Sequence, residues 1–125
     1  MADLDFILPD WPAPPGVRAA VTTRAGGVSG GPFAALNHAA HVGDDPAALA
    51  AHRARLAGAL GLPGEPLWLT QVHGTAVARF DTGHPAPQAD AAVSRRPGEV
   101  CVVMVADCLP VRLASRDGAA VGAAH

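Results

Sequence analysis

Glycine and proline together make up about a fifth of this 125-residue chain, with 14 and 12 copies respectively. Both residues interrupt regular structure, so the composition favours many turns over long helices. One segment does predict a helix, because Asp45 is a suitable N-cap, Pro46 suits the first helical position and leucines recur at helical spacing until Gly61. We expect His52, which falls within this helix, to be solvated.

Short apolar runs elsewhere predict β-strands. The expected strands are residues 17–23, 67–72, 75–81, 89–94, 100–105, 111–114 and 119–124, with a proline-containing loop at His84–Gln88. Residues 100–105 are nearly continuous in apolar side chains and are expected to be buried on both faces. A turn at Arg116-Asp117-Gly118 predicts that the last two strands form a hairpin. The chain is therefore expected to be a single α+β domain spanning residues 1–125.

The charge pattern excludes several classes of partner. The formal net charge is −2, with nine basic against eleven acidic side chains and no run of like charge, so a nucleic-acid partner is not expected. No apolar stretch approaches the roughly 20 residues that span a bilayer. The acidic N-terminus lacks the basic region of a secretory signal. With two cysteines, Cys101 and Cys108, too few for a disulfide framework, we expect a cytoplasmic protein.

Three side chains have the chemistry of a metal site: His73, Cys108 and His125. Two imidazoles and one thiolate match a three-ligand zinc site that leaves a fourth position for water or substrate. The residues lie 35 and then 17 positions apart, so their spacing alone does not establish such a site. A lone cysteine is more often inert core, which is the interpretation kept for Cys101, whereas Asp107 beside Cys108 could orient a ligand or act as a base.

A glycine-rich segment follows Arg24 and includes Gly26 and Gly27. Backbone N–H groups become accessible where side chains are absent, so the segment could cradle an anion. A mobile connection explains the same composition equally well. The adjacent acids Asp44 and Asp45 stand before the predicted helix, where capping explains them.

Seven segments, taken together and in this order, resemble the laccase-domain or multicopper polyphenol oxidase family. They are residues 22–29, 31–37, 41–46, 68–74, 89–91, 106–111 and 122–125, which include Thr-Thr-Arg-Ala-Gly-Gly-Val-Ser, His-Val-Gly-Asp-Asp-Pro, Gln-Val-His-Gly and Ala-Asp-Cys-Leu-Pro-Val. The resemblance extends from about Val17 to the last residue. Members of this family are now regarded as purine nucleoside phosphorylases.

The resemblance implies an α/β-layered fold of mixed β-sheets with flanking helices, and a zinc ion held by His73, Cys108 and His125. It implies phosphorolysis of adenosine, inosine, guanosine and methylthioadenosine to the free base and ribose-1-phosphate, and deamination of adenosine. Copper, which the older family name suggests, is less favoured, because four-electron reduction of dioxygen needs more metal ligands than this sequence offers. The partners expected are purine nucleosides and phosphate, with no nucleic acid and no membrane.

Further roles follow from what this chemistry requires. Phosphorolysis needs an anion anchor, for which Arg24 with the Gly26 and Gly27 backbone is the candidate. Asn37 and Gln71 are candidates for binding the polar groups of the nucleoside. Asp107, or a carboxylate at Asp44 or Asp45, is the candidate proton-transfer group. Deamination would use a zinc-activated water to attack C6 of adenine.

One departure from the family concerns length. Its members continue past the third ligand with a Gly-Trp-Arg segment and a substantial C-terminal part, so we expect this chain to be a truncated fragment. Two other interpretations remain open. One is a metal-free cysteine hydrolase with Cys108 as nucleophile and His73 or His125 as its base. The other is an inactive remnant, or a module that binds a partner through an exposed sheet edge.

Overall fold

The computed structural model describes residues 3–83 and 85–125, so His84 of the expected loop lies outside the described residues. The chain divides into two compact units. The first contains Ala19–Leu62 and the N-terminal segment up to Asp10, and the second contains Trp11–Arg18 and Pro63–His125. No helix within the described ranges is long and apolar enough to cross a bilayer. The single domain over residues 1–125 stays a prediction.

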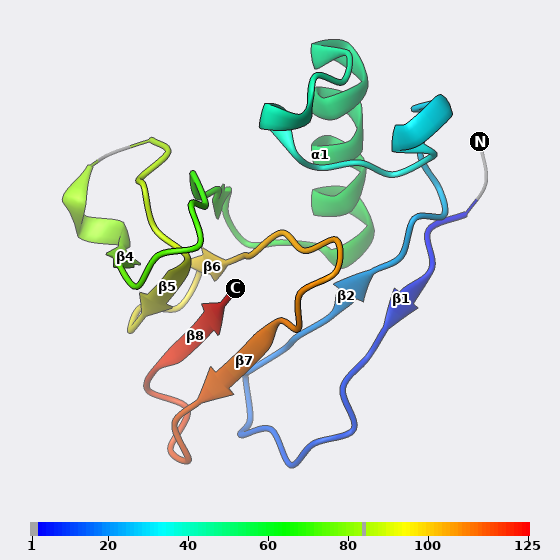
Figure 1. Cartoon of the computed structure of the whole chain (residues 1–125). Coiled ribbons are helices and arrows are strands. Elements are labelled where there is room, and N and C mark those ends of the chain that lie inside the picture. The colour runs from blue at the N-terminus through cyan, green and yellow to red at the C-terminus, as the bar shows by residue number, and fades with distance from the viewer. Residues whose placement is uncertain (1–2, 84) are drawn as a thin grey trace. The chain divides into compact units, whose positions relative to one another are not determined.

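The first unit is built around one α-helix (Figure 1). Its elements are β1 (Phe6–Ile7), β2 (Val21–Thr22), 3-10 turns at Gly31–Phe33 and Ala40–Val42, and α1 (Pro46–Leu60), with β1 and β2 antiparallel. The N-cap prediction is confirmed, because the Asp45 carboxylate accepts the Ala47 N–H at 3.1 Å. The helix ends at Gly61, whose φ of 60° is the left-handed conformation that glycine adopts without strain.

The prediction that His52 is solvated is wrong. Its side chain is 1% exposed and lies with Ala48 and Leu56 on the buried face of α1. A spacing of four residues places these three side chains on one stripe of the helix. The histidine is tolerated there because both of its ring nitrogens are hydrogen-bonded, Nε2 to the Val28 N–H at 2.8 Å and Nδ1 to the Asn37 carbonyl at 2.7 Å.

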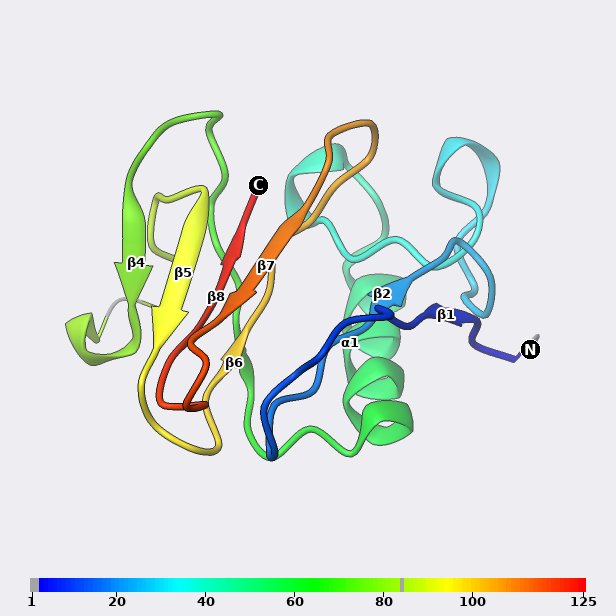
Figure 2. The same ribbon diagram turned by 90° about the horizontal axis from the view of Figure 1, so that it is seen from below.

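The second unit holds most of the strands. Its elements are β3 (Pro66–Leu67), β4 (Val77–Arg79), a 3-10 turn at Phe80–Thr82, β5 (Ala91–Ser94), β6 (Val100–Cys101), β7 (Val111–Ala114) and β8 (Val121–Ala124). One sheet has the order β4-β5-β8-β7, in which β4 and β5 are parallel and the other pairs antiparallel (Figures 1 and 2). Strands β3 and β6 form a separate parallel pair. The predicted hairpin and the α+β class with mixed sheets are confirmed.

The prediction of a strand over residues 100–105 is wrong beyond Cys101. Strand β6 covers only its first two residues, and Val105 is exposed. The Gln71 amide explains the early end, because its Nε2 donates to the Met104 carbonyl at 2.7 Å and its Oε1 accepts the Met104 N–H at 2.8 Å. A side chain therefore takes the hydrogen bonds that a neighbouring strand would otherwise make.

The core of the second unit is made mainly of small side chains. Leu69, Ala78, Ala89 and Ala92 are buried together, and Leu67, Cys101 and Val103 pack against them. Alanine at these positions lets the sheet and the β3–β6 pair approach closely. This core holds one face and one end of the four-stranded sheet in place.

Candidate metal centre

The register of the four-stranded sheet explains how distant residues converge. Val77, Ala91, Ala124 and Val111 form one row across β4, β5, β8 and β7. Strands β4, β5 and β7 begin at this row, and β8 ends there. Four chain segments therefore meet at the same end of the sheet (Figure 2). His73 lies in the segment that leads into β4, and Cys108 lies in the segment that leads into β7. His125 directly follows β8.

The three predicted ligands lie together at this end of the sheet. One ligand atom from each of His73, Cys108 and His125 lies within 4.8 Å of the other two. The two imidazole rings are edge-on, with centroids 4.7 Å apart and an interplanar angle of 63°. Ligands of a tetrahedral zinc ion lie about 3.5 Å apart, given bond lengths of about 2.0–2.3 Å. A contraction of about one ångström would therefore close the cluster around an ion.

Asp90, directly before β5, links the segments of His73 and His125 through hydrogen bonds to its carboxylate. Its Oδ1 accepts the N–H groups of Val72 and Gly74, each at 2.9 Å. Its Oδ2 accepts the His73 N–H at 2.9 Å and His125 Nδ1 at 2.8 Å. The Asp90 side chain is 5% exposed. These hydrogen bonds, first that of Gly74 and then that of His125, hold the pKa of the Asp90 carboxyl well below its usual range, although burial opposes this.

His73 has a backbone conformation that is rare for its residue type. Its φ is 59°, in the left-handed region, where a non-glycine residue costs of order 1–3 kcal/mol. The three consecutive N–H bonds to Asp90 stabilise this turn. Such conformations cluster at functional sites, and here the turn presents the imidazole toward Cys108 and His125.

The donor set fits a bound metal ion. His125 uses Nδ1 for Asp90, so its Nε2 is the nitrogen left for an ion. A carboxylate behind an imidazole is the usual support for a metal-bound histidine, because it fixes the tautomer and the ring orientation. His73 and Cys108 are both exposed, which gives an ion and a further ligand access from solvent.

The two cysteines differ sharply. Cys108 is exposed on the loop between β6 and β7, whereas Cys101 is half-buried in the core. Burial, with a smaller contribution from the charge of Glu99, raises the pKa of the Cys101 thiol to about 11. Cys101 therefore stays a protonated thiol at neutral pH, in line with its interpretation as inert core.

The glycine-rich segment belongs to the first unit and is packed against its own chain. A Cβ on Gly27 would lie 2.0 Å from the Ala35 carbonyl oxygen, and one on Gly26 would lie 2.6 Å from the Leu4 side chain. The Arg24 carbonyl accepts two N–H groups from the same neighbouring segment, at 3.1 and 3.0 Å. Close packing thus accounts for these glycines, and the Arg24 side chain is exposed. Their role as an anion anchor stays a prediction.

The two amides suggested for nucleoside binding are engaged within the chain. Asn37 donates to the Ala39 carbonyl and to Asp44 and accepts the Ala39 N–H, at 3.1, 3.2 and 3.0 Å. The Gln71 amide is paired with Met104, which ties the segment leading to Cys108 to the segment leading to His73. Both amides support loops, and substrate binding by either stays a prediction.

The carboxylates suggested for proton transfer have different surroundings. Asp107 is exposed beside Cys108. Asp45 caps α1, and Asp44 accepts the Ser29 hydroxyl at 2.5 Å, so both have structural roles in the first unit. The orienting contact expected of Asp107 is made by Asp90, which was not among the predicted site residues. It lay inside the strand predicted over residues 89–94, and its place in the family segment of residues 89–91 was the available signal.

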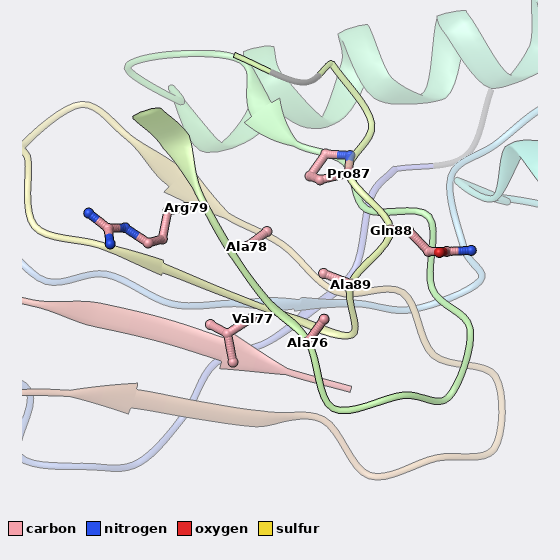
Figure 3. Close-up of a pocket in the computed structure, with 7 residues that line it drawn as sticks. All are labelled: Ala76, Val77, Ala78, Arg79, Pro87, Gln88 and Ala89. Atoms are coloured by element: carbon pink, nitrogen blue, oxygen red, sulfur yellow. The ribbon is translucent and has the colours of Figure 1, made fainter. Parts of the chain in front are cut away.

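A shallow hollow lies on the second unit beside β4 (Figure 3). It is lined by residues 76–79 and 87–89. The lining is mainly alanine, valine and proline, and its one charged side chain, Arg79, pairs with Asp81 at 3.1 Å. None of the three predicted ligands lines the hollow. The cluster of His73, Cys108 and His125 is therefore the better candidate for a functional site.

The fold and the site define a class of protein with a candidate three-ligand metal site at the strand ends of a mixed sheet. Residues 18–125 match the family described as multi-copper polyphenol oxidoreductase laccase. The Escherichia coli (strain K12) protein named purine nucleoside phosphorylase YfiH is 50% identical over 122 residues, covering 96% of this chain and 50% of the relative. A Haemophilus influenzae purine nucleoside phosphorylase is 42% identical over 122 residues, covering 98% of this chain and 50% of the relative.

Solved structures agree. A Neisseria meningitidis protein matches with a TM-score of 0.87 and 44% identity, covering 96% of this chain and 49% of that one. YlmD from Geobacillus stearothermophilus matches with a TM-score of 0.86 and 30% identity, covering 96% and 48%. The chain belongs to the multi-copper polyphenol oxidoreductase laccase family, as its motifs predicted. It spans about half the length of the curated relatives it matches.

Proposed function

We propose that this chain carries the metal centre of a zinc-dependent purine nucleoside phosphorylase that also deaminates adenosine. The observation that carries the proposal is the convergence of His73, Cys108 and His125, whose ligand atoms lie within 4.8 Å of one another. The name of the relative that is 50% identical, purine nucleoside phosphorylase, supports the reaction class. Purine nucleosides and phosphate are the proposed partners, and the cytoplasm the proposed location.

Zinc is preferred over copper because of the ligands. Two imidazoles and one thiolate leave a fourth position open, as in catalytic zinc sites. A multicopper oxidase mechanism requires several metal ions, and the described residues hold this one group of three ligands. When bound here, zinc would supply Lewis-acid activation of a water or of a substrate atom.

The protein's own residues hold the segments that carry the three proposed ligands. Asp90 keeps His73 and His125 in place, and the Gln71–Met104 pairing joins the two segments that carry His73 and Cys108. We assign Arg24, with the Gly26 and Gly27 backbone, to the phosphate. We assign Asp107, exposed beside Cys108, to proton transfer with the leaving base.

The test is a product analysis with adenosine. Zinc-loaded chain is incubated with adenosine, with and without phosphate. Adenine and ribose-1-phosphate that form only with phosphate report phosphorolysis, and inosine that forms without phosphate reports deamination. The matched variants are Cys108→Ala, expected to lose both activities, and Cys101→Ala, expected to keep them because Cys101 lies away from the ligands in the core. Wild-type zinc-loaded chain that forms neither product set would contradict the proposed function.

A second candidate is a metal-free cysteine hydrolase. It is favoured by one observation, an exposed Cys108 with two imidazoles close enough to act as its base. The candidates differ in their response to chelator. Hydrolytic activity that survives removal of metal, and is lost on alkylation of Cys108, would support the hydrolase over the zinc enzyme.

A further inference from the structure

We propose that Asp90 is the positioning residue of the metal centre, because its one carboxylate holds the backbone of one histidine ligand and the ring of another. The proposal rests on the metal centre of the proposed function. It assigns a residue that is not itself a ligand, and it makes the geometry of the centre depend on the orientation of a single carboxylate.

The hydrogen bonds divide between the two carboxylate oxygens. Oδ1 accepts from Val72 and Gly74, and Oδ2 accepts from His73 and His125. Three of these partners are backbone N–H donors, one or more on each carboxylate oxygen, so the site requires a group that presents acceptors on both sides. The Asp90 backbone adds a further link, since its carbonyl accepts the His125 N–H at 2.7 Å. Asp90 thus fixes both the main chain and the ring of His125.

This arrangement sets the tautomer of His125. A neutral imidazole carries one proton, and a carboxylate acceptor at 2.8 Å from Nδ1 places that proton on Nδ1. Nε2 then has a free lone pair, which is the state required for binding a metal ion. At the same time, the N–H bonds hold His73 in its left-handed conformation, with φ of 59°.

Asparagine at this position is the informative change, since it has the same shape but one acceptor fewer. If its oxygen keeps Val72 and Gly74, its NH2 group faces two donors, His73 N–H and His125 Nδ1–H. The conflict at His125 is relieved when its proton moves to Nε2, so that Nδ1 accepts from the amide, whereas the His73 N–H loses its acceptor. That tautomer has no lone pair on the nitrogen that faces the other ligands.

The experiment uses histidine NMR on the metal-free, ¹⁵N-labelled chain, followed by zinc titration against a chromophoric chelator. Wild-type His125 is expected to carry its proton on Nδ1. Asp90→Asn is expected to move it to Nε2, to weaken zinc binding about 10–100-fold, and to alter the visible spectrum of the cobalt-substituted centre. Asp117→Asn is the matched control, because Asp117 also accepts a backbone N–H, from Ala119 at 3.0 Å, and a side-chain donor, Ser115, at 2.7 Å.

Two results would overturn the proposal. One is a wild-type His125 protonated on Nε2, which decides the matter even if Asp90→Asn does not fold. The other is a folded Asp90→Asn chain with unchanged tautomer and zinc affinity. The tautomer is read without metal or substrate, so the two proposals fail separately. An inactive wild-type chain with Nδ1-protonated His125 counts against the phosphorylase and supports the role of Asp90.

Discussion

Each unit of this chain contains a buried histidine near a buried or half-buried aspartate, yet the two networks serve different ends. In the first unit, both ring nitrogens of His52 are bonded to backbone groups, and Asp44 binds Ser29 and Asn37 instead. In the second unit, Asp90 takes one nitrogen of His125, and the other is left beside His73 and Cys108. A structural histidine has both ring nitrogens hydrogen-bonded within the chain, whereas a ligand histidine keeps one ring nitrogen for the metal ion.

The partner of the occupied nitrogen matters as well. A backbone N–H that donates to Nε2 of His52 requires that nitrogen to be unprotonated, which fixes the ring as an internal bridge. A carboxylate behind His125 instead increases the electron density available at its free nitrogen. The first arrangement contributes to folding, and the second prepares a binding site.

Replacing each of the two histidines by asparagine should give the largest difference between the two networks. His125→Asn is expected to weaken zinc binding by more than about 100-fold, because a ligand is lost rather than a supporting group. His52→Asn is expected to leave zinc affinity unchanged, because neither of its ring nitrogens can reach an ion. Chelator competition measures both. Equal losses in the two variants would show that the networks do not differ in the way described.

The reciprocal effect concerns stability and is somewhat smaller. His52→Asn leaves the Val28 N–H and the Asn37 carbonyl, whose hydrogen bonds to His52 are part-buried, without their partners. We expect a loss of about 2–4 kcal/mol in the free energy of unfolding. Urea denaturation of the metal-free chain measures this, with His41→Asn as control, since exposed His41 should contribute within about 0.5 kcal/mol. A loss within that control range would contradict the structural role of His52.

Thiol alkylation compares a ligand cysteine with a core cysteine. The raised pKa of Cys101, about 11, leaves little thiolate at neutral pH, and its half-burial restricts access. In the metal-free chain, exposed Cys108 should react with iodoacetamide at least about tenfold faster. Zinc should protect Cys108 alone. Mass spectrometry of the labelled peptides gives both rates, and protection of neither cysteine by zinc would count against Cys108 as a ligand.

The smallest expected effect involves His38, whose ring lies 6.3 Å from that of His52. Burial, followed by the electrostatic influence of the neighbouring His52 ring and the positive charge of Arg53, lowers the pKa of His38 from 6.5 to about 4. The unfolded chain therefore binds more protons between these values, so stability is full above about pH 6.5 and falls as the pH drops toward 4. His38→Gln should show a shallower decline in thermal midpoint. Identical slopes for wild type and variant would refute this assignment.

Local signals in the sequence were reliable where one residue decides the outcome. Asp45, Pro46 and Gly61 define α1 correctly, and the turn at residues 116–118 predicts the β7–β8 hairpin. The three ligands were identified by their chemistry and by family motifs, and the structure brings them together. Cap residues and turn residues act through neighbouring backbone groups, so the sequence carries their full information.

The remaining features depend on contacts between residues far apart in the chain. Helical periodicity places His52 on the stripe of Ala48 and Leu56, but it does not show that a histidine can be buried there, because the partners Val28 and Asn37 come from other segments. The end of β6 depends on Gln71, which lies 33 residues from Met104. Asp90 contacts His125 only because β5 pairs with β8, which places the two residues opposite each other. Such contacts follow from register, which local patterns do not specify.

The zinc content of the purified chain is the most direct test of the three proposed ligands. The wild-type chain, Cys108→Ala and Cys101→Ala are purified identically, equilibrated with zinc, freed of excess metal and analysed by atomic emission. We expect about one zinc per chain in the wild type and in Cys101→Ala, and essentially none in Cys108→Ala. A folded wild-type chain without zinc, or a Cys108→Ala chain that retains its full content, would contradict a metal centre at His73, Cys108 and His125.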